Sequence, residues 1–206
     1  MNTTVVGASG YSGRQLVSLL IQHPKINLVE VTSRAYSGKT VESCIPNLRG
    51  KTKGLAFTNP SIEELSKNSK CELFFLALPH GTAASYAIPL LEAGKKVIDL
   101  SADFRLLTPE CYEEFYGTPH PAPEWLKKAT YGLPEIHSFT WDDSPLIASP
   151  GCYPTSILIP LFPLLKDQLI EENDIVANSM SGVSGAGRTA SEKLLYCERN
   201  ESASAY

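Results

Sequence analysis

Short apolar runs and amphipathic stretches alternate along the first hundred residues of the chain. Residues 3–6 form a β-branched run that predicts a strand, and residues 15–21 carry apolar side chains at helical spacing. His23-Pro24 ends the predicted helix, and residues 26–32 predict a second strand. The opening of the chain is therefore expected to be a βαβ unit. The apolar face of its helix is expected to comprise Leu16, Leu19 and Leu20.

The alternation of strands and helices continues beyond this unit. Ser61 and Glu64 have the spacing of a capping box at the start of a short helix. Residues 71–78 and 96–100 are apolar enough for buried strands, and between them residues 82–93 predict a helix that Gly94 ends. We expect an α/β fold with a Rossmann-like, doubly wound and mostly parallel sheet.

The pattern becomes less regular in the second half of the chain. Residues 108–144 are punctuated by prolines and predict loops and short helices that cover the ligand edge of the sheet. Residues 146–148 predict the end of a strand, and residues 155–165 predict a helix with Pro154 in its first turn. Residues 174–180 predict a further strand.

Three glycines with the spacing G-x-x-G-x-x-G lie between the first strand and the first helix. Small residues at such a turn let the backbone and a helix N-terminus approach a pyrophosphate. A tight turn without a ligand is the alternative. The candidate cofactor-binding residues of this turn are Gly7, Ser9, Gly10, Tyr11, Ser12 and Gly13.

The end of the second strand is where a dinucleotide-binding fold reads the adenosine ribose. Ser33 and Arg34 stand there, and a hydroxyl with a guanidinium suits a 2′-phosphate, which favours NADP(H) over NAD. Glu30 is the competing candidate, since a carboxylate would accept from a free 2′-hydroxyl. Pro79, His80 and Arg105 follow two later strands and are candidates for the same crevice, with ordinary loop positions as the alternative.

Cys152 lies between an apolar strand ending and the beginning of a helix. The thiolate is the reactive form of cysteine, and the positive end of a helix dipole favours it. A small buried apolar side chain is the alternative reading. Further along, a glycine-serine loop ends in Arg188 and could form an anion site, or it could be a flexible surface loop. A dinucleotide fold followed by a helix-end cysteine indicates thiol-dependent redox chemistry on an acyl group.

Composition excludes several classes of function. Charged residues make up 19% of the chain, the net charge is -4 and no Lys/Arg block is present, so a nucleic-acid partner is not expected. Neither a signal peptide nor a membrane span is evident. The five cysteines form no C-x-x-C pair, so we expect no metal site and no disulfide framework, and we expect a cytoplasmic location.

Five segments together resemble the N-acetyl-γ-glutamyl-phosphate reductase family. They are GASGYSG at 7–13, DLSADFR at 99–105, YGLPE at 131–135, SPGCYPT at 149–155 and SGVSGAGR at 181–188. The resemblance implies NADPH-dependent reduction of N-acetyl-L-glutamyl 5-phosphate to N-acetyl-L-glutamate 5-semialdehyde, with release of inorganic phosphate, in arginine biosynthesis. An aspartate-semialdehyde dehydrogenase-like acyl-phosphate reductase and a non-catalytic dinucleotide-binding module are the alternatives.

The resemblance also implies a role for each matching residue. Cys152 would form a thioester with the acyl group, and Ser33 with Arg34 would hold the 2′-phosphate. Residues 7–13 would hold the pyrophosphate. The remaining assignments are Pro79, Ser181 and Gly182 to the cofactor, the last two near the nicotinamide, and Arg105 and Arg188 to the acyl-phosphate substrate.

One element of the family pattern has no match in the chain. The family's general acid/base is a histidine in an H-R-H-x-P-E-I motif, which none of the chain's four histidines matches: His23, His80, His120 and His137. The resemblance places that motif shortly beyond Tyr206. We therefore expect an N-terminal portion of such an enzyme, homo-oligomeric at full length. We divide it into an NADP-binding Rossmann domain at 1–150 and the beginning of an α+β catalytic and substrate domain at 151–206.

Overall fold

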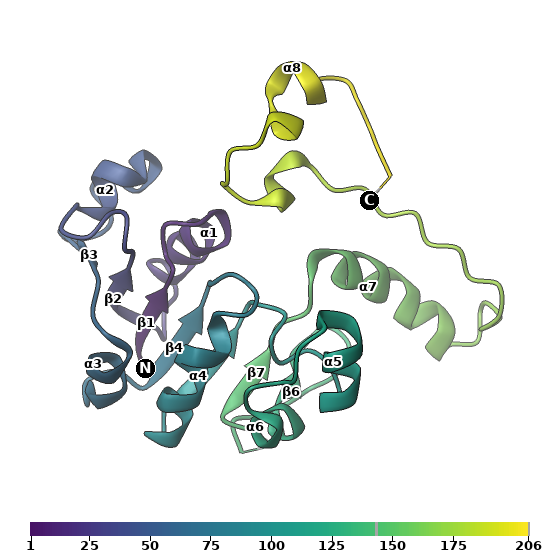
Figure 1. Cartoon of the computed structure of the whole chain (residues 1–206), viewed down its shortest axis with the longest axis horizontal. Coiled ribbons are helices and arrows are strands. Elements are labelled where there is room, and N and C mark those ends of the chain that lie inside the picture. Colours follow the sequence, from purple (N-terminus) through teal and green to yellow (C-terminus); the bar gives the residue numbers. More distant parts are fainter. Residues whose placement is uncertain (143, 206) are drawn as a thin grey trace.

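A seven-stranded sheet forms the centre of the computed structural model, which describes residues 1–142 and 144–205 (Figure 1). Asp143 and Tyr206 lie outside the described residues. Asp143 belongs to the region predicted as loops and short helices at 108–144, and Tyr206 to the domain predicted at 151–206. The strand order is β3-β2-β1-β4-β5-β7-β6, and every neighbouring pair is parallel. The predicted doubly wound α/β fold is confirmed. The strands are β1 (Asn2–Val6), β2 (Asn27–Thr32), β3 (Phe57–Thr58), β4 (Leu73–Leu76), β5 (Lys96–Asp99), β6 (Thr130–Tyr131) and β7 (Leu146–Ala148).

Eight α-helices connect or follow these strands in the described chain. The capping box predicted at Ser61 and Glu64 is present, with each side chain bonded to the other residue's backbone N–H. Gly94, just beyond α4, has a φ of +73°, which suits a glycine that ends a helix. The helices are α1 (Tyr11–Leu20), α2 (Val41–Cys44), α3 (Ile62–Lys67), α4 (Ala83–Glu92), α5 (Pro109–Tyr116), α6 (Pro123–Lys128), α7 (Cys152–Lys166) and α8 (Tyr196–Arg199).

The side-chain alternation of the strands divides the core between the two faces of the sheet. Val5 packs with Val17 of α1 on one face, whereas Val6 packs with Leu90 of α4 on the other. The predicted apolar face of α1 is partly wrong, because Leu19 is 59% exposed. The residues of α1 that face the sheet, Gly13, Val17 and Leu20, are three and four positions apart, and Leu19 lies outside that stripe.

The region predicted as loops and short helices contributes a strand to the sheet. The short helices are present as α5 and α6, but β6 pairs with β7, with Thr130 opposite Ile147 and Tyr131 opposite Ala148. A strand of two residues is too short to show alternation in the sequence. Its existence depends on β7, which supplies the hydrogen-bond partners.

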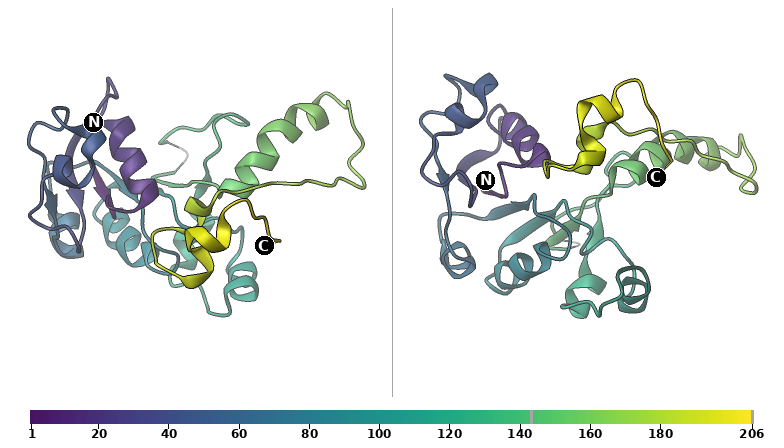
Figure 2. Two further views of the ribbon diagram at one scale, coloured as in Figure 1. Left: turned by 90° about the horizontal axis from the view of Figure 1, so that it is seen from above. Right: turned by 45° about the horizontal axis from the view of Figure 1, so that its top comes forward.

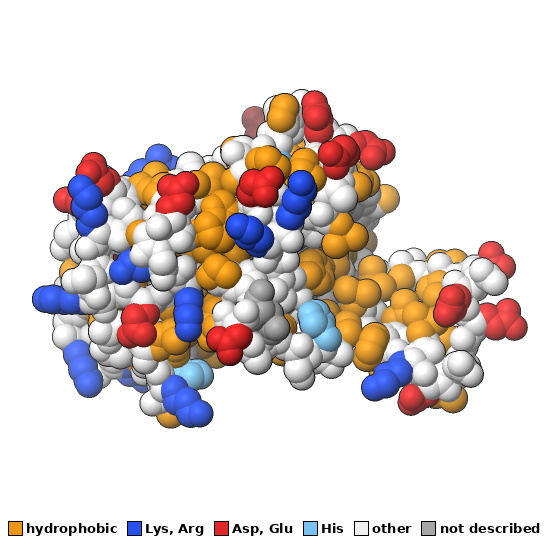
Figure 3. Space-filling view, turned by 90° about the horizontal axis from the view of Figure 1, so that it is seen from below, with side chains coloured by type: hydrophobic (Ala, Val, Ile, Leu, Met, Phe, Trp, Pro, Cys, Tyr) orange, Lys and Arg blue, Asp and Glu red, His pale blue; other side chains and the backbone are white. Residues whose placement is uncertain are grey.

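The chain beyond β7 leaves the packed body. Ala148 is the last buried residue among those described, and α7 extends away from the sheet (Figures 1 and 2) and contains no buried residue. Figure 3 shows hydrophobic side chains gathered on this arm, where Ile159 and Leu164 are exposed. In the described part of the chain, no helix is long and apolar enough to cross a membrane.

The strand predicted at residues 174–180 is wrong. The segment runs back from the far end of α7 as an extended, largely exposed chain (Figure 2), and no described strand pairs with it. A short apolar segment becomes a strand only when a neighbour satisfies its backbone N–H and C=O groups.

A buried carboxyl group ends β5. Asp99 accepts hydrogen bonds from the backbone N–H of Ser101 at 2.9 Å and from the Ser101 hydroxyl at 2.7 Å. Burial, with a smaller contribution from the nearby Asp103, raises the pKa of Asp99 from 3.8 to about 6. The protonated form of Asp99 is therefore the one that folding favours.

Asp99→Asn is expected to remove a pH dependence of stability. Because the folded-state pKa of Asp99 is raised, its contribution to folding is complete below about pH 4 and is lost as the pH rises through about 6. The free energy of unfolding of the variant should therefore gain roughly 2–3 kcal/mol relative to wild type between about pH 4 and pH 7. Urea unfolding at both pH values measures the difference. Glu113→Gln, at an exposed carboxylate of α5, is the control; parallel pH profiles for wild type and D99N would contradict the assignment.

Candidate active site

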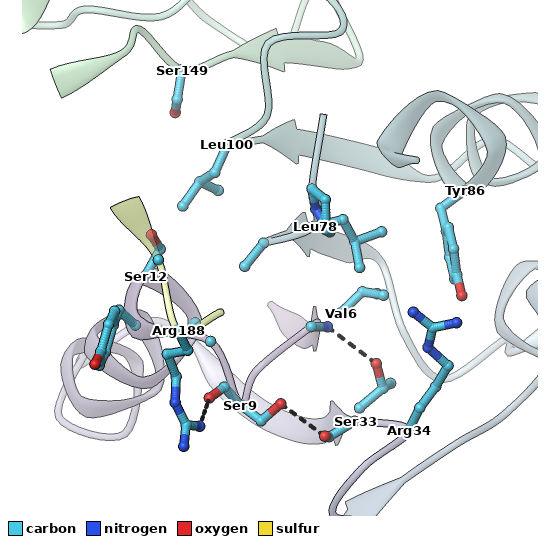
Figure 4. A pocket seen from close by; sticks show the side chains of 18 of the residues that line it. Val6, Ser9, Ser12, Ser33, Arg34, Leu78, Tyr86, Leu100, Ser149 and Arg188 are labelled. Carbon is cyan, nitrogen blue, oxygen red and sulfur yellow. Dashed lines mark hydrogen bonds between the residues drawn. The ribbon is translucent and has the colours of Figure 1, made fainter. Parts of the chain in front are cut away.

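A cleft of about 800 Å³ lies at the carboxyl ends of the strands. It lies where the strand order reverses between β1 and β4, the position at which doubly wound sheets bind ligands (Figure 4). Five strands contribute residues from just beyond their carboxyl ends to the wall of the cleft. These residues are Gly7 after β1, Ser33 after β2, Leu78 after β4, Leu100 after β5 and Ser149 after β7.

Most of the residues singled out from the sequence line this one cleft. The structure brings together Gly7, Ser9, Gly10, Tyr11, Ser12, Gly13, Ser33, Arg34, Pro79, Arg105, Cys152 and Arg188. Ser181 and Gly182 do not line it, although Ser184, Gly185 and Gly187 of the same loop do. The wall also contains Tyr86 of α4, which sequence reasoning missed and which faces Arg34 in Figure 4. A tyrosine in a mostly apolar helix was its only signal in the sequence.

The glycine turn brings the start of α1 close to the sheet. A Cβ on Gly7, whose φ is +79°, would lie 2.4 Å from the Ala77 carbonyl oxygen, and a Cβ on Gly13 would lie 2.5 Å from the Gly7 carbonyl oxygen. Gly10 is the N-cap of α1, and no side chain bonds to the N–H groups of the first turn. Those N–H groups and the helix dipole form a place for an anion at the floor of the cleft.

The end of β2 presents hydroxyl groups and a cation to the cleft. Ser33 is buried and donates a hydrogen bond to the Ser9 hydroxyl at 2.8 Å, whereas the Arg34 side chain is exposed in the cleft. Glu30 does not compete for this position. Its carboxylate accepts from Thr58 of β3 at 2.8 Å, and it lines a separate, smaller cavity.

Cys152 is exposed and is the first residue of α7. The N-cap of this 15-residue helix is Gly151, which no side chain caps. The Arg105 guanidinium lies beside this N-cap. Two hydrogen bonds fix it there, because the Nε atom donates to the Ser149 carbonyl at 2.7 Å and Nη2 donates to the Leu100 carbonyl at 2.8 Å. The Arg105 Nη1 atom is 3.2 Å from the position of a Cβ on Gly151. A helix N-terminus and a fixed cation thus make this corner of the cleft electropositive.

His80, which its position after β4 made a candidate for the crevice, does not lie in the cleft wall. Its Nδ1 atom is 2.9 Å from Asp103, and its ring stacks on Tyr116 at 4.1 Å. The buried Asp103 carboxylate also accepts from the backbone N–H groups of Gly81 at 2.7 Å and Ala84 at 2.9 Å, so it holds the start of α4. His80 therefore belongs to the packing of α4 and α5.

Arg188 lies on the glycine-turn side of the cleft. It donates to the Ser9 carbonyl at 2.8 Å and to the Tyr36 hydroxyl at 3.3 Å. The loop that ends in Arg188 thus contacts the glycine turn although 179 residues separate the two partners. In the part of the chain that the structure describes, no three His, Cys, Asp or Glu side chains gather as a metal site would require.

Two family models match the chain. Residues 2–143 match the model of the semialdehyde dehydrogenase NAD binding domain. The chain belongs to the semialdehyde dehydrogenase family. Residues 152–206 match the dimerisation domain of the same family. The cleft at the carboxyl ends of the strands lies within the part of the chain that matches this NAD binding domain, apart from the residues that the chain beyond β7 contributes.

Several relatives that match over the whole length of the chain share one name. An N-acetyl-gamma-glutamyl-phosphate reductase of Akkermansia muciniphila is 50% identical over 207 residues, which covers 100% of this chain and 59% of the relative. A protein of the same name from Desulfotalea psychrophila is 48% identical over 202 residues, covering 98% of this chain and 57% of the relative. The chain thus spans less than three fifths of the length of these semialdehyde dehydrogenase relatives.

Solved semialdehyde dehydrogenases share the fold. Aspartate semialdehyde dehydrogenase II of Vibrio cholerae superposes with a TM-score of 0.56 at 21% identity, covering 80% of this chain and 46% of that one. The aspartate semialdehyde dehydrogenase of Francisella tularensis has a TM-score of 0.56 at 17% identity, covering 82% of this chain and 41% of that one. At these identities, the likeness shows the fold alone.

Proposed function

We propose that the protein carrying this chain is an NADP-dependent acyl-phosphate reductase that converts N-acetyl-L-glutamyl 5-phosphate to N-acetyl-L-glutamate 5-semialdehyde and releases inorganic phosphate. The observation that carries the proposal is the position of Cys152, which faces the cleft that the glycine turn also lines. The relatives of that name, which match the chain over its whole length, support the choice of substrate.

The arrangement suits a thioester mechanism. The Cys152 sulfur attacks the acyl carbon, the carbon–phosphate oxygen bond breaks, and phosphate leaves with the bonding electrons. Backbone N–H groups at the start of α7 stabilise the negative charge on the carbonyl oxygen, and Arg105 attracts the departing anion. When bound, NADPH supplies the hydride that reduces the thioester. The resulting tetrahedral adduct on Cys152 then releases the aldehyde and regenerates the thiol, with the uptake of one proton.

The contacts at the end of β2 support NADP(H) as the cofactor. Ser33 and Arg34 would hold a 2′-phosphate, and Glu30, which would favour a free ribose hydroxyl, is bonded to Thr58 outside the cleft. Gly7 and Gly13 let α1 start close against the turn, since a Cβ at either position would meet backbone, and the first N–H groups of α1 would then face a pyrophosphate. Pro79, Ser181 and Gly182 remain proposed cofactor contacts.

The organisation of the whole protein follows from the same proposal. We place the boundary between the NADP-binding domain and the catalytic and substrate domain at residues 150–151, because Ala148 is the last buried residue of those described. The match of residues 152–206 to a dimerisation domain supports a homo-oligomer. The five free cysteines support a cytoplasmic location.

Labelling with iodoacetamide tests the assignment of Cys152 as the nucleophile. We expect Cys152 to react at least about 10-fold faster than Cys197 at neutral pH, because only Cys152 combines exposure with the N-terminus of a long helix and an adjacent arginine. Cys71 should react slowest, because it is buried and burial raises the pKa of its thiol. Peptide mapping over time measures all three rates. Equal rates for Cys152 and Cys197 would instead favour a non-catalytic dinucleotide-binding module.

A further inference from the structure

Four basic side chains gather at the end of β2 without an acidic partner. Arg14 and Arg188 both donate to the Ser9 carbonyl, Arg34 enters the cleft, and Lys39 lies over the Tyr36 ring with 5.5 Å between the Nζ atom and the ring centre. The ion pairs found among the described residues are Lys67–Glu63, His80–Asp103 and Lys127–Glu124, and none of them includes a member of this cluster. Arg34 and Arg188 line the cleft and Arg14 and Lys39 lie beside it, and such a concentration of uncompensated cations attracts an anion.

A closed ring of hydrogen bonds joins Arg188 to the residue expected to bind the ribose. Arg188 donates to the Ser9 carbonyl at 2.8 Å and to the Tyr36 hydroxyl at 3.3 Å. The Ser33 hydroxyl donates to the Ser9 hydroxyl at 2.8 Å and accepts from the Tyr36 backbone N–H at 3.3 Å. Arg188 and Ser33 are therefore linked by two hydrogen-bonded paths, one through Ser9 and one through Tyr36 (Figure 4 shows the path through Ser9).

Two tyrosine rings hold the Arg188 side chain on the wall of the cleft. The guanidinium carbon is 5.9 Å from the centre of the Tyr11 ring and 5.9 Å from the centre of the Tyr36 ring. The hydrogen bond and the charge of Arg188 lower the pKa of the Tyr36 hydroxyl, and the charge of Arg14 adds to the effect. The environment of Ser33 thus favours negative charge from several directions.

We propose that Arg188 is a ligand of the 2′-phosphate of the cofactor and completes, with Ser33 and Arg34, an anion site built from two distant parts of the chain. The inference rests on the proposed function and deepens it, since it gives Arg188 a role in cofactor choice instead of the substrate contact that the family resemblance implies. Arginine suits this role because its fork of N–H donors matches phosphate oxygens.

The proposed contact has a consequence for the nicotinamide end of the cleft. Arg188 ends the loop that contains Ser181 and Gly182, the proposed nicotinamide contacts, and Ser184, Gly185 and Gly187 of this loop line the cleft. A cofactor with a 2′-phosphate would hold this loop through Arg188, whereas a cofactor with a free ribose hydroxyl would not. Selectivity for NADP(H) and the placing of the loop thus depend on one side chain.

Calorimetric titration of a protein of the relatives' full length that contains this sequence, with adenosine 2′,5′-bisphosphate and with 5′-ADP, tests the proposal. Arg188→Gln is expected to weaken binding of the 2′,5′-bisphosphate about 10-fold through the loss of a charge-assisted contact, and to leave 5′-ADP binding within about twofold of wild type. Lys51→Gln makes the same change of charge at an exposed residue outside the cleft wall and should alter neither affinity. Arg188→Lys keeps the charge without the planar fork and should recover part of the affinity.

The other possible outcomes distinguish a failure of the role proposed for Arg188 from a failure of the proposed use of NADP(H). If wild type prefers the 2′,5′-bisphosphate and R188Q retains that preference, Arg188 does not bind the 2′-phosphate, and the proposed function stands. An equal loss of affinity for both nucleotides would show that Arg188 only supports the glycine turn, which also overturns the inference. If wild type shows no preference for the 2′,5′-bisphosphate, the proposed use of NADP(H) fails and the inference fails with it.

Discussion

Cys152→Ser is expected to lower the rate of acyl-phosphate reduction about 10⁴-fold or more, because a serine hydroxyl at the same position is a far weaker nucleophile at neutral pH. The measurement is the phosphate-dependent reduction of NADP by N-acetyl-L-glutamate 5-semialdehyde. Because the chain spans 57–59% of the length of its relatives, the assay uses a protein of the relatives' full length that contains this sequence. Binding of NADPH to C152S should stay close to wild type, since the glycine turn and the end of β2 are unchanged.

Cys197→Ser is the matched control for this variant. It makes the same chemical change at another exposed cysteine, one that lies in the short helix α8 and outside the cleft wall. C197S should keep the wild-type rate. A C152S protein that retains more than about a tenth of the wild-type activity would exclude Cys152 as the nucleophile. A wild-type protein that prefers aspartate semialdehyde would contradict the proposed substrate while leaving the role of Cys152 intact.

Gly13→Ala is expected to lower the free energy of unfolding by about 3 kcal/mol, equivalent to a fall of roughly 6–12 °C in the melting temperature. A Cβ on Gly13 would lie 2.5 Å from the Gly7 carbonyl oxygen and 2.7 Å from the Ala8 Cα, so α1 must move away from the turn. Both neighbours are backbone atoms, which cannot yield by rotating a side chain. The displacement would also remove the N–H groups of α1 from the position where they face a pyrophosphate.

Gly10→Ala provides the comparison within the same turn. A Cβ there would meet only the Gly7 carbonyl oxygen, at the ordinary contact distance of 3.7 Å, and Gly10 has a φ of −67° that any residue adopts. The cost should be about 1 kcal/mol or less, since alanine is a poorer N-cap than glycine. Thermal unfolding followed by circular dichroism measures both variants. Similar melting temperatures for G13A and G10A would show that the close approach of α1 to the turn is not a requirement of the fold.

Local patterns were sufficient for the elements that carry the chemistry. The βαβ unit with its glycine turn, the capping box of α3 and the helix that begins at Cys152 each depend on residues within a few positions of one another. Helical periodicity, glycine punctuation and capping act over that range, so they can be recognised without knowing what the segment will contact.

Contacts between distant segments decided two points that the sequence left open. The direction of Glu30 depended on Thr58, which comes from another strand, and the place of His80 depended on Asp103, which lies beyond α4 and β5. In both cases the residue is close, along the sequence, to residues of the candidate site. Which partner it finds is set by how the strands and helices pack.

The sequence by itself determined an α/β dinucleotide-binding fold and a cysteine at the start of a helix, because periodicity, glycine spacing and helix signals are written in neighbouring residues. Only the tertiary structure decided that β6 joins the sheet, that residues 174–180 form no strand, and that Arg188 meets Ser9 and Tyr36. The first and the third of these outcomes require a partner far away in the chain, and the second reflects the lack of such a partner among the described residues. Such a partner supplies hydrogen bonds or a counterpart for a charge only after the chain has folded.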